Sequence, residues 1–479
     1  MPNWLPGALD YVSRWIEFQL RLFEQPGCAI AVVHEGQTVL DVAFGRADLR
    51  TGEELTPRHR ARVASHSKTF TAAGIMKLRE RGAVGLDDRI GAHVRGLHAT
   101  LAEARLTQLL SHTSGVVRDG VTGDQWFDRR PFADETELSA ALCDAPTIEP
   151  NTRFKYSNYG YGLLGRLIEA VTGEPYTIWI KREIVDAACL AETVPDMPLC
   201  AGEPMASGHS GKLPLGRRVV LPGCQPTNAL APATGFVSTA ADLARFFAQL
   251  IPSSKSELLT AASRREMTRP QWRNPHSTLE RHYGLGTMSG GARDWWWFGH
   301  AGAFQGFLSQ TTALPAHDVT ISIVTNAIDG SAYQWMAGAL QIMQTFARNG
   351  PAADAVRDWG GRWWSIWNTT DLVPMGTKVL VANPVMPMPF ADASEITVAG
   401  PDRGTIAVAN GYGSHGEGVE RIRGSDGQVN ELRLAGSTLV PEERVAAELR
   451  ACETGAAEPA SDGTVARPGA PRSVLSDGT

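Results

Sequence analysis

At 479 residues the chain exceeds what a single hydrophobic core supports, which predicts a large domain and a smaller one. Hydrophobic residues make up 43% of the sequence and charged residues 20%, proportions that indicate a packed globular protein and exclude a disordered one. The formal net charge is -6 with acids and bases interspersed, so we expect neither nucleic acid nor an anionic membrane surface as a partner.

The six cysteines are scattered, with no C-x-x-C pair and no histidine at zinc-finger spacing. We therefore expect the cysteines to be buried, unpaired thiols that pack as small apolar side chains, in a protein of a reducing compartment. The first twenty residues include Asp10, Arg14 and Glu17, so they lack the apolar core of a signal peptide, and no later run reaches the roughly 18 apolar residues of a membrane span. We therefore expect a cytoplasmic protein without membrane association.

The N-terminal region predicts a helix followed by a hairpin. Residues 9–23 carry apolar side chains at helical spacing, and Pro26 follows them. Two β-rich runs, 28–33 and 38–44, are joined through Glu35-Gly36, a pair typical of a hairpin turn.

The region from about residue 62 to 290 is predicted to be largely helical, with Gly- and Pro-rich loops between the helices. Strand-like runs return at 295–298, 306–313 and 319–326, and a closing helix is predicted over 333–347. Strands at both ends of the domain flank a helical insert. The predicted fold class is therefore α/β (α+β), one antiparallel sheet flanked by helices, with a cleft between sheet and insert.

A second unit is predicted after Pro351. Short strand-like runs separated by Gly, Asn and Asp turns, without helical periodicity, predict a small antiparallel β-barrel over 355–450. The first domain is then expected over 1–350. The last stretch, 453–479, has scarcely any large apolar residue and is predicted to be a disordered tail.

A candidate nucleophile lies at the start of the second predicted helix. Ser65 and Lys68 are three residues apart, which places both side chains on one helix face one turn apart. A serine becomes a useful nucleophile when a desolvated, partly neutral amine can take its proton. The helix N-terminus also favours negative charge developing on an attacked carbonyl. Alone the pattern is weak, since a capping serine followed by a solvated lysine also explains it.

Two further motifs follow in order. Tyr156-Ser157-Asn158 opens a helical run, and His300-Ala301-Gly302 lies on a predicted strand. Together the three motifs resemble those of the penicillin-recognising serine enzymes: class C β-lactamases, D-alanyl-D-alanine carboxypeptidases, D-aminopeptidases and related esterases. The segments 106–115 and 232–242 also resemble stretches typical of that family. The resemblance spans roughly residues 20 to 345 and implies a β-lactamase/transpeptidase-like fold.

The resemblance implies a catalytic role for each motif. Ser65 would attack the acyl carbon, Lys68 would help remove its proton, and Tyr156, as a phenolate or a hydrogen-bond relay, would pass the proton to the leaving group. Asn158 would orient Lys68 and the substrate amide. The oxyanion would rest between the backbone N–H groups of Ser65 and Ala303.

The third motif departs from most β-lactamases. Ala303 follows Gly302, whose missing side chain is expected to let the substrate lie close. His300 is expected to be a catalytic partner of Ser65 together with Lys68 and Tyr156, and it stands where most β-lactamases carry a lysine that binds the substrate carboxylate. An imidazole is only partly charged near neutral pH, so we expect weaker, pH-dependent carboxylate recognition. Histidine here resembles D-aminopeptidases, some carboxypeptidases and peptide-cyclising thioesterases, which argues against antibiotic resistance as the native role.

Other conspicuous residues have structural explanations as well. Trp295, Trp296 and Trp297 either line an apolar pocket or pack on the two sides of a strand, and the sequence favours neither. His66 and His112 are predicted to be hydrogen-bonded structural histidines. The unit over about 355–445 resembles the lipocalin-like appendage of some D-aminopeptidase and thioesterase relatives, which implies a barrel that restricts substrate size.

These features predict a serine hydrolase that acts on amide or peptide bonds of small peptide-like substrates, with no metal and no organic cofactor. The expected partner is a small-molecule or short-peptide substrate, and the oligomeric state is left open. A carboxylesterase, a peptide-cyclising acyltransferase or thioesterase, and a β-lactamase stay open as alternatives, because motifs do not encode the leaving group. A penicillin sensor that is acylated once finds no support, since no membrane segment or signalling domain is evident.

Overall fold

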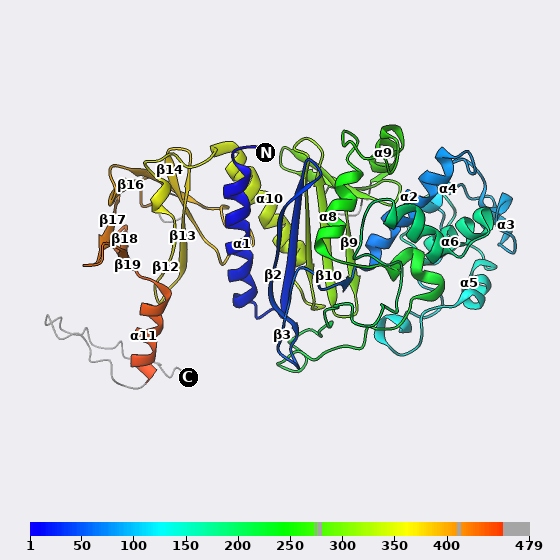
Figure 1. The fold of residues 1–479 in the computed structure, drawn as a ribbon, viewed down its shortest axis with the longest axis horizontal. Helices are drawn as coiled ribbons and strands as arrows, with labels where there is room; N and C mark the ends of the chain where they lie inside the picture. Colours follow the sequence, from blue (N-terminus) through cyan, green and yellow to red (C-terminus); the bar gives the residue numbers. More distant parts are fainter. Residues whose placement is uncertain (274, 276–279, 410–412, 454–479) are drawn as a thin grey trace, which may run out of the picture. The chain divides into compact units, whose positions relative to one another are not determined.

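The computed structural model describes residues 1–273, 275, 280–409 and 413–453 (Figure 1). The chain divides into two units. The first comprises Met1–Pro351 together with Pro384–Ala391, and the second comprises Ala352–Asn383 and the residues from Asp392 onward. We expected Pro384–Ala391 in the second domain, whereas these residues pack within the first unit. The predicted disordered tail lies outside the described residues apart from Glu453.

A nine-stranded antiparallel sheet forms the centre of the first unit. Every residue of the strand Gly27–His34 is buried, because this strand lies inside the sheet and both of its faces are covered. The strands, in spatial order, are β3 (Glu53–Glu54), β2 (Gln37–Asp48), β1 (Gly27–His34), β11 (Val319–Thr325), β10 (Phe307–Leu314), β9 (Trp295–Phe304), β8 (Met288–Ala292), β7 (Arg281–Tyr283) and β6 (Trp272–Arg273).

Helices cover both faces of this sheet (Figure 1). On one face, α1 (Leu5–Leu22) and α10 (Ala332–Asn349) pack against each other and the strands. On the other face, α8 (Ala240–Gln249) contacts β1, β10 and β11, and α2 (Ser67–Glu80) and α6 (Asn158–Thr172) lie beyond it. The predicted N-terminal and closing helices correspond to α1 and α10, and the fold class of sheet and helical insert is confirmed.

Aromatic stacking fixes the helix that carries the candidate nucleophile. The ring of Phe70, on α2, stacks against those of Phe236 and Phe246, with centroids 4.3 and 3.9 Å apart. All three side chains are fully buried. Aromatic pairs of this kind contribute about 0.5–1.5 kcal/mol beyond the area that they bury, so they hold α2 firmly against α8.

The second unit contains the predicted antiparallel barrel, built as a consecutive meander of eight strands. Trp364 and Val440 exchange two backbone hydrogen bonds of 2.8 Å, which join the first strand to the end of the last. The helix α11 (Glu442–Glu453) follows and was not predicted. The strands are β12 (Gly361–Trp364), β13 (Thr369–Met375), β14 (Lys378–Ala382), β15 (Ser394–Val398), β16 (Arg403–Val408), β17 (Gly418–Arg423), β18 (Val429–Leu434) and β19 (Ser437–Leu439).

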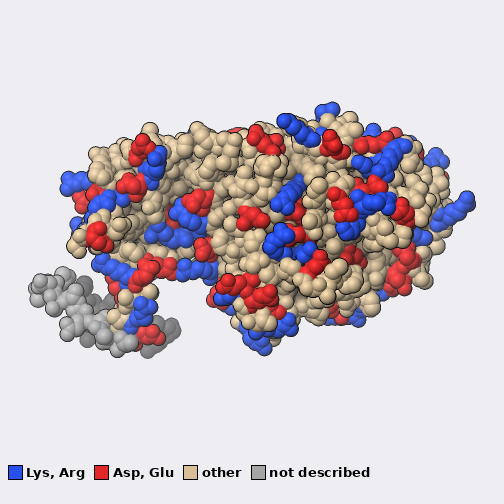
Figure 2. Space-filling view, in the orientation of Figure 1, with Lys and Arg blue, Asp and Glu red and all other residues tan. Residues whose placement is uncertain are grey.

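The surface agrees with one prediction from composition and contradicts another. Basic and acidic side chains interleave on the face shown in Figure 2, without a basic stripe on that face. Cys28 is buried, but the other five cysteines are exposed, so the prediction of buried thiols is wrong for them. No helix within the described ranges combines the length and apolarity needed to cross a bilayer.

Candidate active site

Ser65 lies in a tight turn that leads into α2. The turn is the 3-10 segment Ala64–His66, and Ala64 has a φ of 46°, a left-handed conformation that is costly for a residue with a Cβ and that recurs at functional sites. Ser67 Oγ donates to the carbonyl of Ala64 and accepts a hydrogen bond of 2.9 Å from the backbone N–H of Phe236. These bonds hold the turn, and with it the Ser65 hydroxyl, in place.

Lys68 is arranged to act as a base toward Ser65. Its buried Nζ lies 3.2 Å from Ser65 Oγ and donates to Asn158 Oδ1 at 2.7 Å and to the Ala233 carbonyl at 2.8 Å. Burial lowers the pKa of Lys68 well below its ordinary value, because desolvation disfavours the ammonium. A neutral amine has two N–H donors, and the two carbonyl oxygens accept both. Its lone pair is therefore left for the Ser65 hydroxyl.

Tyr156 supplies the second contact to the nucleophile. Its hydroxyl lies 2.8 Å from Ser65 Oγ, and its ring packs on His112 with centroids 4.1 Å apart. Burial raises the pKa of Tyr156, so the side chain is a neutral phenol near neutral pH. A neutral phenol at this distance fits the hydrogen-bond relay better than the phenolate, and the catalytic role of Tyr156 stays a prediction.

The start of α6 positions the Tyr-x-Asn motif. Ser157 caps the helix, because its Oγ accepts a 2.8 Å hydrogen bond from the backbone N–H of Gly160. Asn158, the first helical residue, then connects Lys68 to Asp119, to which its Nδ2 donates at 2.6 Å. The bond from Lys68 to Asn158 is the contact that orientation of Lys68 would need, and the role of Asn158 stays a prediction.

A charged pair beside the motif was missed by the sequence reasoning. Asp119 also accepts from Arg118 Nε at 2.9 Å, and the Arg118 guanidinium lies 5.6 Å from the centre of the Tyr156 ring. Arg118 lowers the pKa of Lys68 and Asp119 raises it, both by Coulomb interaction. The pair lies shortly after the segment 106–115 that resembles the family, but nothing in a loop sequence indicates that its side chains reach a motif about 40 residues away.

His300 is buried on β9 and bonds to a residue that the sequence reasoning did not single out. Its Nε2 lies 3.0 Å from the hydroxyl of Tyr283. Burial, reinforced by repulsion from His66, lowers the pKa of His300 well below its usual range, so the imidazole is neutral near neutral pH. The partial charge that we expected there is absent. Among the described residues, no hydrogen bond joins His300 to Ser65.

Gly302 brings β9 close to the nucleophile's turn. A Cβ at this position would lie 2.2 Å from the Val63 carbonyl and 3.0 Å from His66 Nδ1. The close approach that requires glycine is therefore made by the protein itself, whereas we had expected a substrate. Ala303 follows on the same strand and is exposed, and the role of its N–H in an oxyanion hole stays a prediction.

Both histidines that were predicted to be structural are hydrogen-bonded. His66 Nε2 lies 3.0 Å from Thr311 Oγ1, and His112 Nδ1 accepts from the backbone N–H of Ser157 at 3.1 Å. Burial lowers the pKa of His66 to about 4 and that of His112 well below its usual value. Neither ring is charged near neutral pH.

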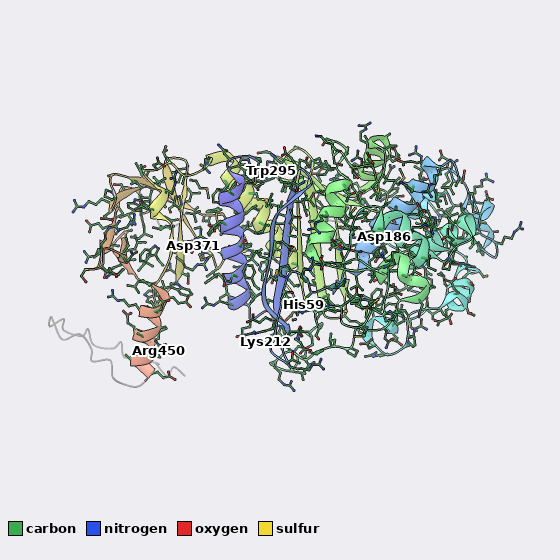
Figure 3. The ribbon with its side chains drawn as sticks, in the orientation of Figure 1. His59, Asp186, Lys212, Trp295, Asp371 and Arg450 are labelled. Atoms are coloured by element: carbon green, nitrogen blue, oxygen red, sulfur yellow. The ribbon has the colours of Figure 1, made fainter. Side chains whose placement is uncertain are left out.

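Of the tryptophans on β9, Trp295 packs against other aromatic rings and Trp297 lines a pocket, so each of the two explanations from the sequence holds for one of them. Trp295 packs against His317 and Trp4, with ring centroids 4.0 and 6.0 Å apart, and it lies beside the N-terminal end of α1 (Figure 3). Trp297 lines an apolar cavity, but this cavity lies on the sheet face away from Ser65.

Within the described part of the chain, no group of three or more His, Cys, Asp or Glu side chains is placed to hold a metal ion.

The chain is similar in sequence and in fold to several known proteins. Protein flp of Staphylococcus aureus (strain N315) is 30% identical over 176 residues, 35% of this chain and 34% of that protein, so the chain matches about a third of its length. The structure of the octameric penicillin-binding protein homologue from Pyrococcus abyssi aligns with a TM-score of 0.64 and 19% identity over 90% of this chain and 99% of that one, which shows the fold.

A second solved structure is closer in sequence. The D-stereospecific amidohydrolase from Streptomyces sp. is 25% identical, with a TM-score of 0.57 over 69% of this chain and 98% of that one. The family model described as Beta-lactamase matches residues 20–335, which include every site residue named above. The chain therefore belongs to the beta-lactamase family.

Proposed function

We propose that this protein is a serine hydrolase that cleaves amide or peptide bonds of small peptide-like substrates through an acyl intermediate on Ser65. One observation carries the proposal: Ser65 Oγ lies 3.2 Å from the buried amine of Lys68 and 2.8 Å from the phenol of Tyr156. A base and a proton relay thus converge on one hydroxyl. The similarity to a D-stereospecific amidohydrolase supports amides as the substrate class.

Acylation uses these groups in sequence. The hydroxyl proton of Ser65 passes to the lone pair of neutral Lys68 as Oγ bonds to the carbonyl carbon, and the π electrons of the carbonyl move onto its oxygen. Backbone N–H groups of Ser65 and Ala303 would stabilise this oxyanion, a contribution typically worth about 10² to 10³ in rate per donor. When the C–N bond breaks, Tyr156 donates its proton to the leaving nitrogen and recovers the one held by Lys68.

Deacylation reverses the proton path. A water molecule gives a proton to neutral Lys68 while its oxygen bonds to the acyl carbon. The ester bond to Ser65 then breaks, and Oγ takes the proton back from Lys68. The free acid leaves, and each protein group returns to its starting protonation state.

A substrate panel tests this proposal. D- and L-aminoacyl amides, p-nitrophenyl esters of the same acyl groups and nitrocefin would be assayed with the wild type and with Ser65→Ala. We expect steady turnover of aminoacyl amides well beyond one equivalent, and none by the variant. Turnover of esters alone would replace the proposal with a carboxylesterase, and nitrocefin turnover that rivals both would replace it with a β-lactamase. Release of a single equivalent would indicate a sensor.

A further inference from the structure

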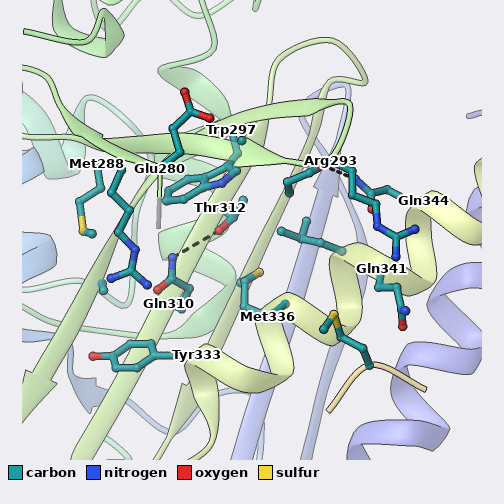
Figure 4. A pocket seen from close by; sticks show the side chains of 17 residues that line it. Glu280, Met288, Arg293, Trp297, Gln310, Thr312, Tyr333, Met336, Gln341 and Gln344 are labelled. Atoms are coloured by element: carbon teal, nitrogen blue, oxygen red, sulfur yellow. Dashed lines mark hydrogen bonds between the residues drawn. The ribbon is translucent and has the colours of Figure 1, made fainter. Parts of the chain in front are cut away.

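A cavity of about 530 Å³ lies between α10 and the strands β8, β9 and β10 (Figure 4). Ala301 lines it, whereas the preceding residue, His300, lies on the opposite face near His66, with ring centroids 6.0 Å apart. Because successive residues of a strand point to opposite faces, the sheet separates this cavity from Ser65. The cavity therefore lies behind the strand that carries the third motif, and it approaches the candidate active site at Tyr333, which lines it and donates to the Gly302 carbonyl at 3.1 Å.

The wall of the cavity is mainly apolar and adaptable. Met288 from β8, Met336 from α10 and Met388 from the segment Pro384–Ala391 approach it from three directions, and Trp297 adds an aromatic face. Unbranched thioether side chains adapt to ligands of irregular or flexible shape. Protein interiors are normally close-packed, and a volume of this size falls in the range of about 300–1,000 Å³ that small-molecule sites occupy.

One amide in the cavity retains hydrogen-bonding capacity. Among the residues that the structure describes, Gln310 Nε2 reaches only Thr312 Oγ1, at 3.5 Å, which is the limit of a hydrogen bond (Figure 4). By contrast, Gln341 Oε1 accepts from the backbone N–H of Phe390 at 3.1 Å, and Gln344 donates to the Ala292 carbonyl. A polar group of a ligand would therefore find its partner at Gln310.

The rim of the cavity carries an excess of positive charge. Arg281 and Arg293 line it together with a single acid, Glu280, and both arginines are exposed. Over the described ranges, neither arginine forms an ion pair. Guanidinium groups bind carboxylates well, so the rim is complementary to a ligand with one anionic end.

We propose that this cavity binds a monocarboxylic acid with a flexible apolar body, such as a medium-chain fatty acid. The apolar chain lies among the three methionines and Trp297, and the carboxylate lies toward Arg281 and Arg293. This binding is independent of the chemistry at Ser65 and does not rest on the proposed hydrolase activity.

Calorimetric titration of the full chain with decanoate tests the site, using a substitution that fills it. Ala337 lines the cavity from an exposed position of α10, so Ala337→Trp is compatible with folding and should weaken decanoate binding by about tenfold or more. The matched control is Gln334→Trp, exposed on the same helix outside the cavity, and it should bind decanoate as the wild type does. Thermal unfolding would verify that both variants fold. Unchanged affinity in Ala337→Trp, or equal losses in both variants, would overturn the proposal.

Two further titrations identify the headgroup and the location. The double variant Arg281→Gln/Arg293→Gln should bind decanoate about threefold to fivefold more weakly and 1-decanol unchanged, because exposed charge pairs contribute little each. Equal affinity of wild type and double variant for decanoate would show that the two arginines do not bind the carboxylate, and this would contradict the proposed headgroup. Protein phosphonylated at Ser65 should bind decanoate as well as free protein does. Loss of binding on phosphonylation would place the acid in the active site instead and overturn the assignment.

Discussion

In the proposed mechanism, the protonation state of Lys68 decides whether Ser65 can act as a nucleophile. The ammonium form would need acceptors for three protons, and the geometry offers Asn158 Oδ1, the Ala233 carbonyl and Ser65 Oγ. Desolvation tips the balance toward the neutral amine, since burial lowers the pKa of Lys68 well below its ordinary value. The burial that disfavours the ammonium form of Lys68 therefore favours the base that the proposed mechanism needs.

Replacement of Lys68 by arginine tests this role. A guanidinium stays protonated in proteins, so Lys68→Arg replaces the amine with a group that cannot accept the Ser65 proton, and kcat/KM should fall by about 10² to 10⁴. Steady-state assays with p-nitrophenyl esters would measure the loss. Lys77→Arg is the control, because Lys77 lies on the same helix and donates to the Leu258 carbonyl, away from Ser65. Full activity in Lys68→Arg would contradict the assignment.

The charged pair Arg118–Asp119 should modify a pH dependence that burial of Lys68 mainly determines. The proposed mechanism requires neutral Lys68, so kcat/KM should fall as the pH drops through the pKa of this group. Arg118 lowers that pKa and Asp119 raises it. Arg118→Gln should therefore move the acidic limb of the pH profile to higher pH, and Asp119→Asn should move it to lower pH. Shifts in the opposite directions, or a limb that neither substitution moves, would argue against Lys68 as the titrating base.

The sequence predicted part of this site for physical reasons. The spacing of Ser65 and Lys68 places their side chains together on any helix, and the motif resemblance adds Tyr156 and Asn158. The carbonyl of Ala233 could not be predicted, because every residue has a backbone acceptor and only the fold brings this one to Lys68. The same holds for Tyr283, whose contact with the third motif depends on the pairing of neighbouring strands.

At the scale of elements, the site depends on how closely β9 approaches the turn before α2. Gly302 permits that approach, because the Val63 carbonyl and Ser309 Oγ occupy the space of a side chain. The strand thus contributes through its backbone as much as through its motif side chains. A glycine in a strand interior often marks such a close backbone approach.

Gly302→Ala should therefore destabilise the first unit. The added Cβ would lie 2.2 Å from Val63 O, and relief of such overpacking typically costs about 1–3 kcal/mol of the free energy of unfolding. Gly211→Ala is the control, because its Cβ would have no neighbour closer than 3.7 Å and should change stability by about 0.5 kcal/mol or less. Urea denaturation followed by tryptophan fluorescence would compare the two variants. Equal stability of Gly302→Ala and the wild type would show that the backbone at Val63 leaves room for a Cβ at residue 302 and would contradict the close approach of the turn to β9.

Predictions of elements succeeded where the periodicity was strong. The central strands and the long amphipathic helices, such as α1 and α10, stand out through repeated apolar positions. The helix α11 was missed because it buries only Val445 and so lacks an apolar stripe. Periodicity also cannot reveal which unit a connecting segment packs against.

At the scale of the whole molecule, the two units are not two uninterrupted stretches of chain. Pro384–Ala391 connects β14 to β15 of the second unit yet packs within the first. The Pro384 carbonyl accepts from Trp15 Nε1 at 3.1 Å and from Gln19 Nε2 at 2.5 Å. A first unit that ended at residue 351 would therefore leave buried donors of α1 without these acceptors.

Phe390 provides a test of this packing within the full chain. Its side chain is 9% exposed, and its ring lies 5.3 Å from that of Tyr11. Phe390→Ala should lower the stability of the first unit by about 3 kcal/mol, through the lost burial and the cavity left behind. Met386→Ala, at a position 44% exposed in the same segment, should cost about 0.5 kcal/mol or less. Equal thermal midpoints for the two variants would show that the segment does not support the first unit.

The central claim is that a covalent acyl group forms on Ser65. Intact-protein mass spectrometry after rapid mixing with an aminoacyl p-nitrophenyl ester measures this directly, followed by peptide mapping of the adduct. We predict a mass increase of one acyl group, located on the peptide that contains Ser65, which decays as free acid appears and is absent in Ser65→Ala. An adduct on another residue, or undiminished turnover by Ser65→Ala, would contradict the account.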